Sequence, residues 1–179
     1  MAEKRVALLR GINVGPAKRV AMADLRALLA ELGYSAVRTL LNSGNVVYTT
    51  VAGSPSDDAS RIEAAVASQL GVVARVTVLT AAELDAAIAG NPLVAVADNP
   101  SRLLVAFVAD PADLDRLAPL AAQDWGPEAL VLGSRVVYLW CPAGVAASQV
   151  SKALNRALGD AVTSRNWSTV LKLQVMTRK

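Results

Sequence analysis

The chain has 179 residues, of which 54% are hydrophobic, and its 18 lysines and arginines against 15 aspartates and glutamates give a net charge of +3. This composition excludes a disordered chain, and so small a charge does not by itself indicate a nucleic-acid partner. The chain has no histidine and one cysteine, Cys141. These counts exclude Ser-His-Asp and Cys-His catalysis, histidine- or thiolate-ligated metal sites and an intrachain disulfide. We therefore expect neither a metal nor a cofactor.

The first 80 residues predict one lobe with the order β-α-β-β-α-β. The apolar run Val6–Leu9 is typical of a strand, and leucines at helical spacing before Gly33 indicate a helix. The turn residues 41–45 predict a hairpin. The expected elements are a strand at 4–10, a helix ending before Gly33, strands at 36–40 and 46–50, a helix ending near Gly71, and a strand at 72–79.

A helical connection over 81–100 follows, opened by the capping box Thr80–Glu83. Leu93, Val94 and Val96 predict that this connection is buried. A second βαββαβ lobe is expected over 101–165 and a C-terminal helix over 166–179. The expected elements of that lobe are a strand at 103–108, a helix after Asp110-Pro111, a hairpin of 130–132 with 135–140, a helix stopped by Gly159, and a short strand at 161–164.

Two short matches between the lobes indicate an internal duplication. Val46-Val47-Tyr48 is echoed by Val136-Val137-Tyr138, and Gln69-Leu70-Gly71 is echoed by Ala157-Leu158-Gly159. The predicted fold class is α+β. It consists of two tandem ferredoxin-like (α/β-plait, βαββαβ) lobes with antiparallel sheets, two helices on one face of each, and a C-terminal helix.

In that fold the first strand lies beside the third, so the loop 10–15 and the turn 42–45 are expected to meet at one end of the first lobe. A guanidinium, side-chain amides and glycine-exposed backbone amides suit a small anionic ligand. Ordinary turn chemistry explains the same residues without a ligand. The loop fits neither the P-loop nor the dinucleotide pattern. The candidate ligand-binding residues here are Arg10, Asn13, Asn42, Ser43 and Asn45, with Lys18 and Arg19 nearby.

A second polar cluster, Thr163–Thr169, follows the predicted last strand. Arg165 and Asn166 are candidates for an anion site at the start of the terminal helix. The alternative is that Ser164 or Asn166 caps this helix while Trp167 docks it.

Three other residues are given structural interpretations. Cys141, with no histidine to activate it, favours a core position over a nucleophile. Asp57 and Asp58 indicate charges at a helix N-terminus, which the helix dipole favours.

The chain closely resembles the bacterial domain of unknown function 1697 family. The matching segments run in the family's order over essentially the whole chain: Leu8–Gly15, Met22–Leu25, Leu32-Gly33, Asn42–Val47, Asn91-Pro92, Tyr138–Pro142 and Arg165–Thr169. The resemblance implies two α/β-plait lobes and brings no established biochemical role. Family members commonly carry a second glycine and a lysine at Pro16 and Ala17, and often Ser-Lys at Ser148-Gln149. Lys152, one turn away, could replace that lysine.

Four functions stay open from the sequence. The first is binding of a small anionic metabolite, and the second is a cofactor-independent enzyme at the same loops, which lacks a recognisable general base. Nucleic-acid binding ranks third, because only Tyr48, Tyr138 and Trp140 could stack bases on central strands. A homodimer formed through sheet edges is the fourth. The opening apolar run is too short for a signal peptide, and no stretch reaches the roughly 18 residues of a membrane span. We expect a cytoplasmic protein without a membrane partner.

Overall fold

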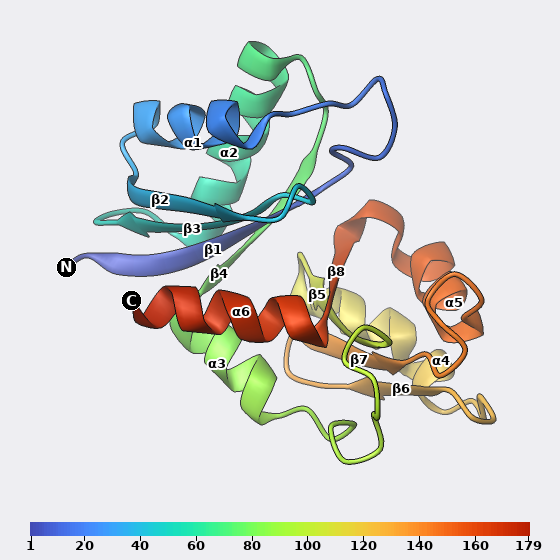
Figure 1. Cartoon of the computed structure of the whole chain (residues 1–179). Coiled ribbons are helices and arrows are strands. Elements are labelled where there is room, and N and C mark those ends of the chain that lie inside the picture. The colour runs from blue at the N-terminus through green and yellow to red at the C-terminus, as the bar shows by residue number, and fades with distance from the viewer. The chain divides into compact units, whose positions relative to one another are not determined.

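The computed structural model describes residues 1–179 as two compact units. The first unit consists of Met1–Leu84 together with Leu173–Lys179, and the second of Asp85–Lys172. Each unit contains one four-stranded antiparallel sheet with helices packed on it (Figure 1). The predicted α+β class with two sheets is therefore confirmed. None of the helices is both long and apolar enough to span a bilayer.

The sheet of the first unit has the strand order β2-β3-β1-β4, with β1 antiparallel to both of its neighbours. The elements in chain order are β1 (Glu3–Arg10), α1 (Met22–Glu31), β2 (Ser35–Leu40), β3 (Asn45–Thr50), α2 (Pro55–Leu70) and β4 (Arg75–Thr80). Helices α1 and α2 cover one face of this sheet (Figure 1). The core between them and the sheet includes Ala7 and Leu9 of β1 and Leu25 and Ile62 of the helices.

The ends of α2 follow from the local sequence. Ser54 and Asp57 form a reciprocal capping box, Pro55 occupies the first helical turn, and Gly71 ends the helix at φ 68°. A proline in the first turn loses no helical hydrogen bond, and a glycine adopts positive φ without a Cβ penalty. These three signals place the boundaries of α2 where the sequence predicts them.

The second unit has the strand order β6-β7-β5-β8. Its elements are β5 (Leu103–Val108), η1 (Pro111–Leu117), α4 (Ala118–Ala121), β6 (Ala129–Leu132), β7 (Val136–Trp140), α5 (Gln149–Leu158), η2 (Gly159–Ala161) and β8 (Val162–Asn166). Helix α3 (Ala81–Ala89) precedes them and α6 (Trp167–Arg178) follows. The Thr80–Glu83 capping box at the start of α3 is confirmed in both directions, by hydrogen bonds of 2.8 and 3.1 Å.

The last turn of α6 belongs to the first unit. Arg38 of β2 donates from Nη2 to the carbonyl oxygen of Met176 at 2.5 Å. A guanidinium at a helix C-terminus is favourable, because the last carbonyl groups have no partner within the helix and carry partial negative charge.

Three sequence-based expectations are corrected. The fourth strand begins at Arg75, not at Val72, and the intervening Val73 is 78% exposed. The helix after Asp110-Pro111 is a seven-residue 3₁₀ helix followed by a four-residue α-helix. In the connection after α3, Leu93 is buried as expected, but Val94 and Val96 are exposed.

The two Val-Val-Tyr segments are not structurally equivalent. The Leu9 amide donates to the Gly44 carbonyl oxygen in the first unit, and the Val108 amide donates to the Arg135 carbonyl oxygen in the second. Gly44 and Arg135 therefore occupy the same position in the two sheets. Four residues further on, Tyr48 corresponds to Leu139. Tyr48 accordingly packs in the core under the helices, whereas the Tyr138 hydroxyl donates to Ala87 of α3 at 2.6 Å. Successive strand residues face opposite sides of a sheet, so a one-residue slip reverses the face. This sequence echo is therefore out of register.

Candidate functional site

The loop after β1 contacts the β2–β3 turn, as the sequence predicts. Asn13 donates from Nδ2 to the carbonyl oxygen of Asn42 at 2.6 Å, and the Leu9 amide donates to the Gly44 carbonyl oxygen at 2.8 Å. The first bond joins two polar loop residues, and the second extends the β1–β3 ladder into the turn. The two bends therefore share one end of the first unit.

Gly44 is required by this close approach. Its φ is 89°, and a Cβ placed on it would lie 2.7 Å from Leu9 Cβ and 2.9 Å from Ile12 Cδ1. Both distances are shorter than any normal carbon–carbon contact. A side chain at this position would force the loop and the turn apart.

Asn13 holds the loop in shape. Its backbone amide donates to Lys18 O at 2.6 Å, Oδ1 accepts from the Val20 amide at 2.9 Å, and Nδ2 donates to Val20 O at 3.0 Å. With φ at 54°, Asn13 occupies the left-handed region that asparagine tolerates better than most residues. Both amide protons of Nδ2 are used within the protein, so the Asn13 side chain positions the loop and offers a ligand no free N–H.

A hollow of about 420 Å³ lies beside these contacts, lined by Asn13, Arg19, Val20, Ala21 and Asn42. Ala21 is the N-cap residue of α1 and supplies no side-chain acceptor for the amides of the first helical turn. The carboxylate of that turn, Asp24, lines a separate hollow formed with α2. The larger hollow thus combines an exposed guanidinium with the electropositive end of a helix.

Three of the predicted site residues do not line this hollow. Arg10 is half-buried at the end of β1, directly opposite Arg75 of β4. Asn45 is 0% exposed, and its Nδ2 donates to Leu40 O at 2.8 Å and to Ser43 Oγ at 2.9 Å. Asn45 and Ser43 therefore stabilise the turn through hydrogen bonds within it, which is the structural interpretation given above as the alternative to ligand binding. Arg19, which the sequence placed only nearby, is among the lining residues.

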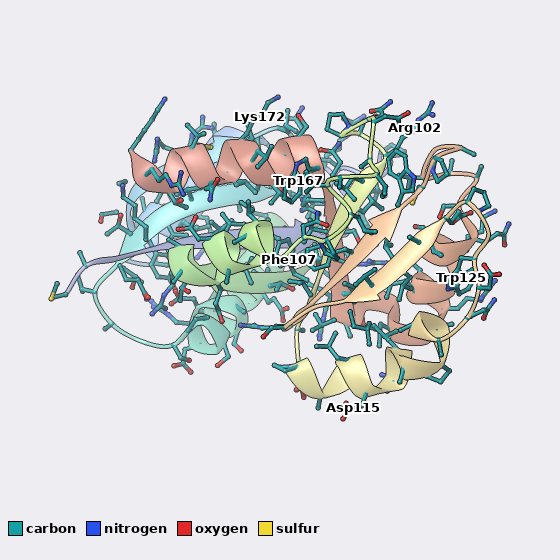
Figure 2. The ribbon with its side chains drawn as sticks, turned by 90° about the horizontal axis from the view of Figure 1, so that it is seen from below. Arg102, Phe107, Asp115, Trp125, Trp167 and Lys172 are labelled. Atoms are coloured by element: carbon teal, nitrogen blue, oxygen red, sulfur yellow. The ribbon has the colours of Figure 1, made fainter.

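Arg165 and Asn166 lie on β8 of the second unit. Asn166 Oδ1 accepts from the Thr169 amide at 2.9 Å, so Asn166 caps the first turn of α6, which is the structural alternative proposed for it. Arg165 donates from Nη1 to Ser164 O at 2.9 Å. Trp167, labelled in Figure 2, is the first residue of α6.

In the second unit, the side chain of Glu128 accepts hydrogen bonds from the N-terminus of α5. The Glu128 carboxylate accepts from the Gln149 and Val150 amides at 2.9 and 3.0 Å, and from the buried Ser148 hydroxyl at 2.7 Å. Partial burial opposes ionisation of Glu128, but these donors and the charge of Lys152 outweigh it and lower its pKa. The N-terminus of α5 is thus occupied by a carboxylate of the chain itself.

Replacing Glu128 by glutamine is expected to destabilise the protein by about 1 kcal/mol at pH 7, because it removes a carboxylate charge from the N-terminus of α5 while Ser148 stays as the N-cap. Because the folded-state pKa of Glu128 is lowered, the contribution of its charge is present above the unfolded-state pKa. It is lost as the pH falls through the folded-state value. Urea unfolding should show a larger difference between wild type and E128Q at pH 7 than at pH 3. An equal difference at both pH values would contradict this role.

Cys141 is buried in the core of the second unit, as predicted. Burial raises the pKa of its thiol. A thiol that stays protonated and lies out of reach of solvent is a poor nucleophile. Among the residues of the structure, no group of three or more metal-ligating side chains is assembled either.

One polar cluster was not predicted from the sequence. Asp58 of α2, which the sequence indicated only as a helix N-terminal charge, is 1% exposed and accepts from Arg5 Nη1 at 2.8 Å. The Tyr34 and Tyr48 hydroxyls each donate to Asp58 at 2.7 Å. Burial first, and then the hydrogen bond to Asp58, raise the pKa of both tyrosines, which keeps them neutral donors. The cluster is closed on itself and leaves no room for a ligand on Asp58.

These features define an α+β protein with two sheet units and, in the first, a hollow that brings an arginine to the N-terminus of a helix. The chain belongs to the family described as "Protein of unknown function (DUF1697)", whose model matches residues 2–138. A similar solved structure is that of the conserved bacterial protein SP0830 from Streptococcus pneumoniae, with a TM-score of 0.82 and 24% identity over 99% of both chains. At that identity the likeness shows the fold alone. None of the curated proteins is significantly similar to this chain.

Proposed function

We propose that the first unit binds a small anionic metabolite in the hollow lined by Arg19, Ala21 and Asn42. The observation that carries the proposal is the joint placement of the Arg19 side chain and the uncapped N-terminus of α1 around one space of about 420 Å³. That volume suits a small molecule, since ligand pockets typically measure about 300–1,000 Å³. Guanidinium and helix-terminal amide groups are both preferred partners of carboxylate and phosphate.

Rigidity of the surrounding backbone supports the proposal. Asn13 ties the loop to Val20 and to the turn at Asn42, and Gly44 lets the turn approach β1. The residues that would contact a ligand are therefore held by hydrogen bonds that do not involve the ligand. Such preorganisation reduces the entropy lost on binding.

The alternatives at this site have less support. A cofactor-independent enzyme would need a general base, and the lining of the hollow contains only asparagine, arginine, valine and alanine. Nucleic-acid binding through central-strand aromatics would need exposed rings. Tyr48, Tyr138 and Trp140 are 0%, 2% and 8% exposed, so they offer no stacking surface.

Calorimetric titration with orthophosphate, succinate and adenosine monophosphate at constant ionic strength tests this function. We expect saturable binding of at least one of these probes. The variant R19Q should bind that probe at least about tenfold more weakly, because a charge-assisted hydrogen bond contributes about 1.5–3 kcal/mol.

The matched control is R26Q. Arg26 lies on α1, the helix whose N-terminus borders the hollow, and its guanidinium donates to Thr39 Oγ1 at 2.7 Å instead of lining the hollow. Its replacement should leave the affinity unchanged. No saturable binding by any of the three probes, or equal affinities in wild type and R19Q, would contradict the proposal.

The finer fold assignment is also a proposal. We infer that both units are ferredoxin-like plaits that arose by duplication in a bacterial lineage. Supporting this are the matching orders β2-β3-β1-β4 and β6-β7-β5-β8 and the positive-φ glycines, Gly71 and Gly159, that end α2 and α5. We further propose a cytoplasmic location, a reducing compartment in which Cys141 stays a thiol.

A further inference from the structure

Strand β6 differs from two other edge strands in how its edge is protected. An edge strand exposes unpaired backbone groups to other chains, and proteins usually block it with a bulge, a charge or a covering group. Strand β2 has a register irregularity between Ser35 and Arg38, with Ala36 at φ 50°. On β4, the outward amides of Val76 and Thr80 donate at 2.8 Å to the side chains of Glu63 and Glu83.

Strand β6 has none of these devices. Its sequence, Ala129-Leu130-Val131-Leu132, contains no charge and no proline, and its four residues pair with β7 in one unbroken register. Trp125, in the connection before β6, contacts the core and not the β6 edge. Its indole N–H donates to Leu120 O at 2.8 Å, and its ring packs on the core of the second unit (Figure 2).

The hydrogen-bond phase shows which groups of β6 face outward. The Gly133 amide donates to Val136 O at 2.8 Å, which makes that pair a hydrogen-bonded one. Pairing alternates along an antiparallel ladder, so Val131 and Ala129 bond to β7 while Leu130 and Leu132 direct their N–H and C=O groups to the open edge. Two residues thus present four unpaired backbone groups.

We propose that β6 pairs with β6 of a second copy of this chain, antiparallel across a twofold axis. The segment Leu130-Val131-Leu132 reads the same in both directions, so such an axis places Leu130 opposite the partner's Leu132 and Val131 opposite the partner's Val131. The four-stranded sheets of two copies then form one continuous sheet. With no charged side chain on β6, self-pairing brings no like charges together, and the facing valines are a favourable cross-strand pair.

The proposed register can be tested by a disulfide. Residues 131 of the two copies would form a pair without hydrogen bonds between them, whose Cα atoms lie about 4.5 Å apart, a distance that a disulfide can span. V131C should therefore form a covalent dimer on mild oxidation, while the buried Cys141 stays unreacted. The control S134C places a thiol on an exposed position of the β6–β7 turn and should form no covalent dimer.

Sedimentation equilibrium tests the association without a cross-link. A ladder of two residues per chain predicts a weak dimer, so wild type should be followed up to about 1 mM. V131K, which would place two lysines opposite each other, should be monomeric throughout, and V131T should associate like wild type. Circular dichroism checks that each variant is folded. A wild type that stays monomeric, or a dimer that persists in V131K, would overturn the proposal.

Discussion

Replacing Asp58 by alanine is expected to lower the free energy of unfolding by about 3–5 kcal/mol, the range for removing one partner of a buried ion pair. Asp58 and Arg5 are 1% and 5% exposed, and their contact measures 2.8 Å. Without the carboxylate, the Arg5 guanidinium loses its buried counter-charge, and the hydroxyls of Tyr34 and Tyr48 lose their acceptor. Chemical denaturation monitored by tyrosine fluorescence or circular dichroism measures the effect.

The matched control for D58A is D57A. Asp57 stands one residue earlier in the same helical turn, but its carboxylate is exposed and takes part only in the capping box with Ser54. Its loss should cost far less than the loss of Asp58. Comparable destabilisation by the two variants would show that Asp58 acts only as a helix N-terminal charge, as its sequence position suggests.

Replacing Gly44 by alanine should destabilise the protein by about 2–5 kcal/mol. Left-handed backbone costs an alanine roughly 1–2 kcal/mol, and forcing a methyl group into a filled space costs about 1–3 kcal/mol more. The new Cβ would meet Leu9 Cβ and Ile12 Cδ1 at distances below 3 Å. Thermal unfolding of purified G44A measures the loss.

The variant G71A separates the two contributions to this loss. Gly71 also has a positive φ, 68°, but a Cβ on it would meet nothing within 4 Å. G71A should therefore show only the backbone cost. If G44A were no less stable than G71A, the loop and the turn would have room for a Cβ at position 44, which contradicts the close contact between them.

Most of the secondary structure could be predicted because local signals agree with tertiary ones. The leucines of α1 fall on one helical face, and Gly33 and Gly71 follow the helices that they end. The start of β4 was missed because Val73 is β-branched and apolar yet exposed, and propensity does not report burial. The slipped Val-Val-Tyr echo has a related cause, since three matching letters do not specify strand register.

The position of the candidate site could be predicted from the strand order, but the residues that line it could not. Knowing that β1 lies beside β3 was enough to bring the loop to the turn. Which side chains then face solvent depends on local geometry. Asn45 turns inward to bond Leu40 and Ser43, whereas the fold of the loop around Asn13 brings Arg19 to the hollow.

The Arg5–Asp58 cluster could not be predicted because its members are far apart in the sequence. Arg5 stands in a charged opening segment, Asp58 in a helix start, and Tyr34 and Tyr48 in or beside separate strands. Each position has an ordinary local explanation. Only the packing of α2 on the sheet assembles a guanidinium, a carboxylate and two phenols into one buried network.

The most direct test of the anion-binding account is a ¹⁵N-correlated NMR titration of the wild-type chain with orthophosphate, succinate and adenosine monophosphate at fixed ionic strength. The account predicts saturable shifts of the backbone amides of Arg19, Val20, Ala21 and Asn42, and of the first turn of α1, with one of these anions. Amides that do not move with any of the three, or shifts that spread evenly over basic residues of both units, would contradict it.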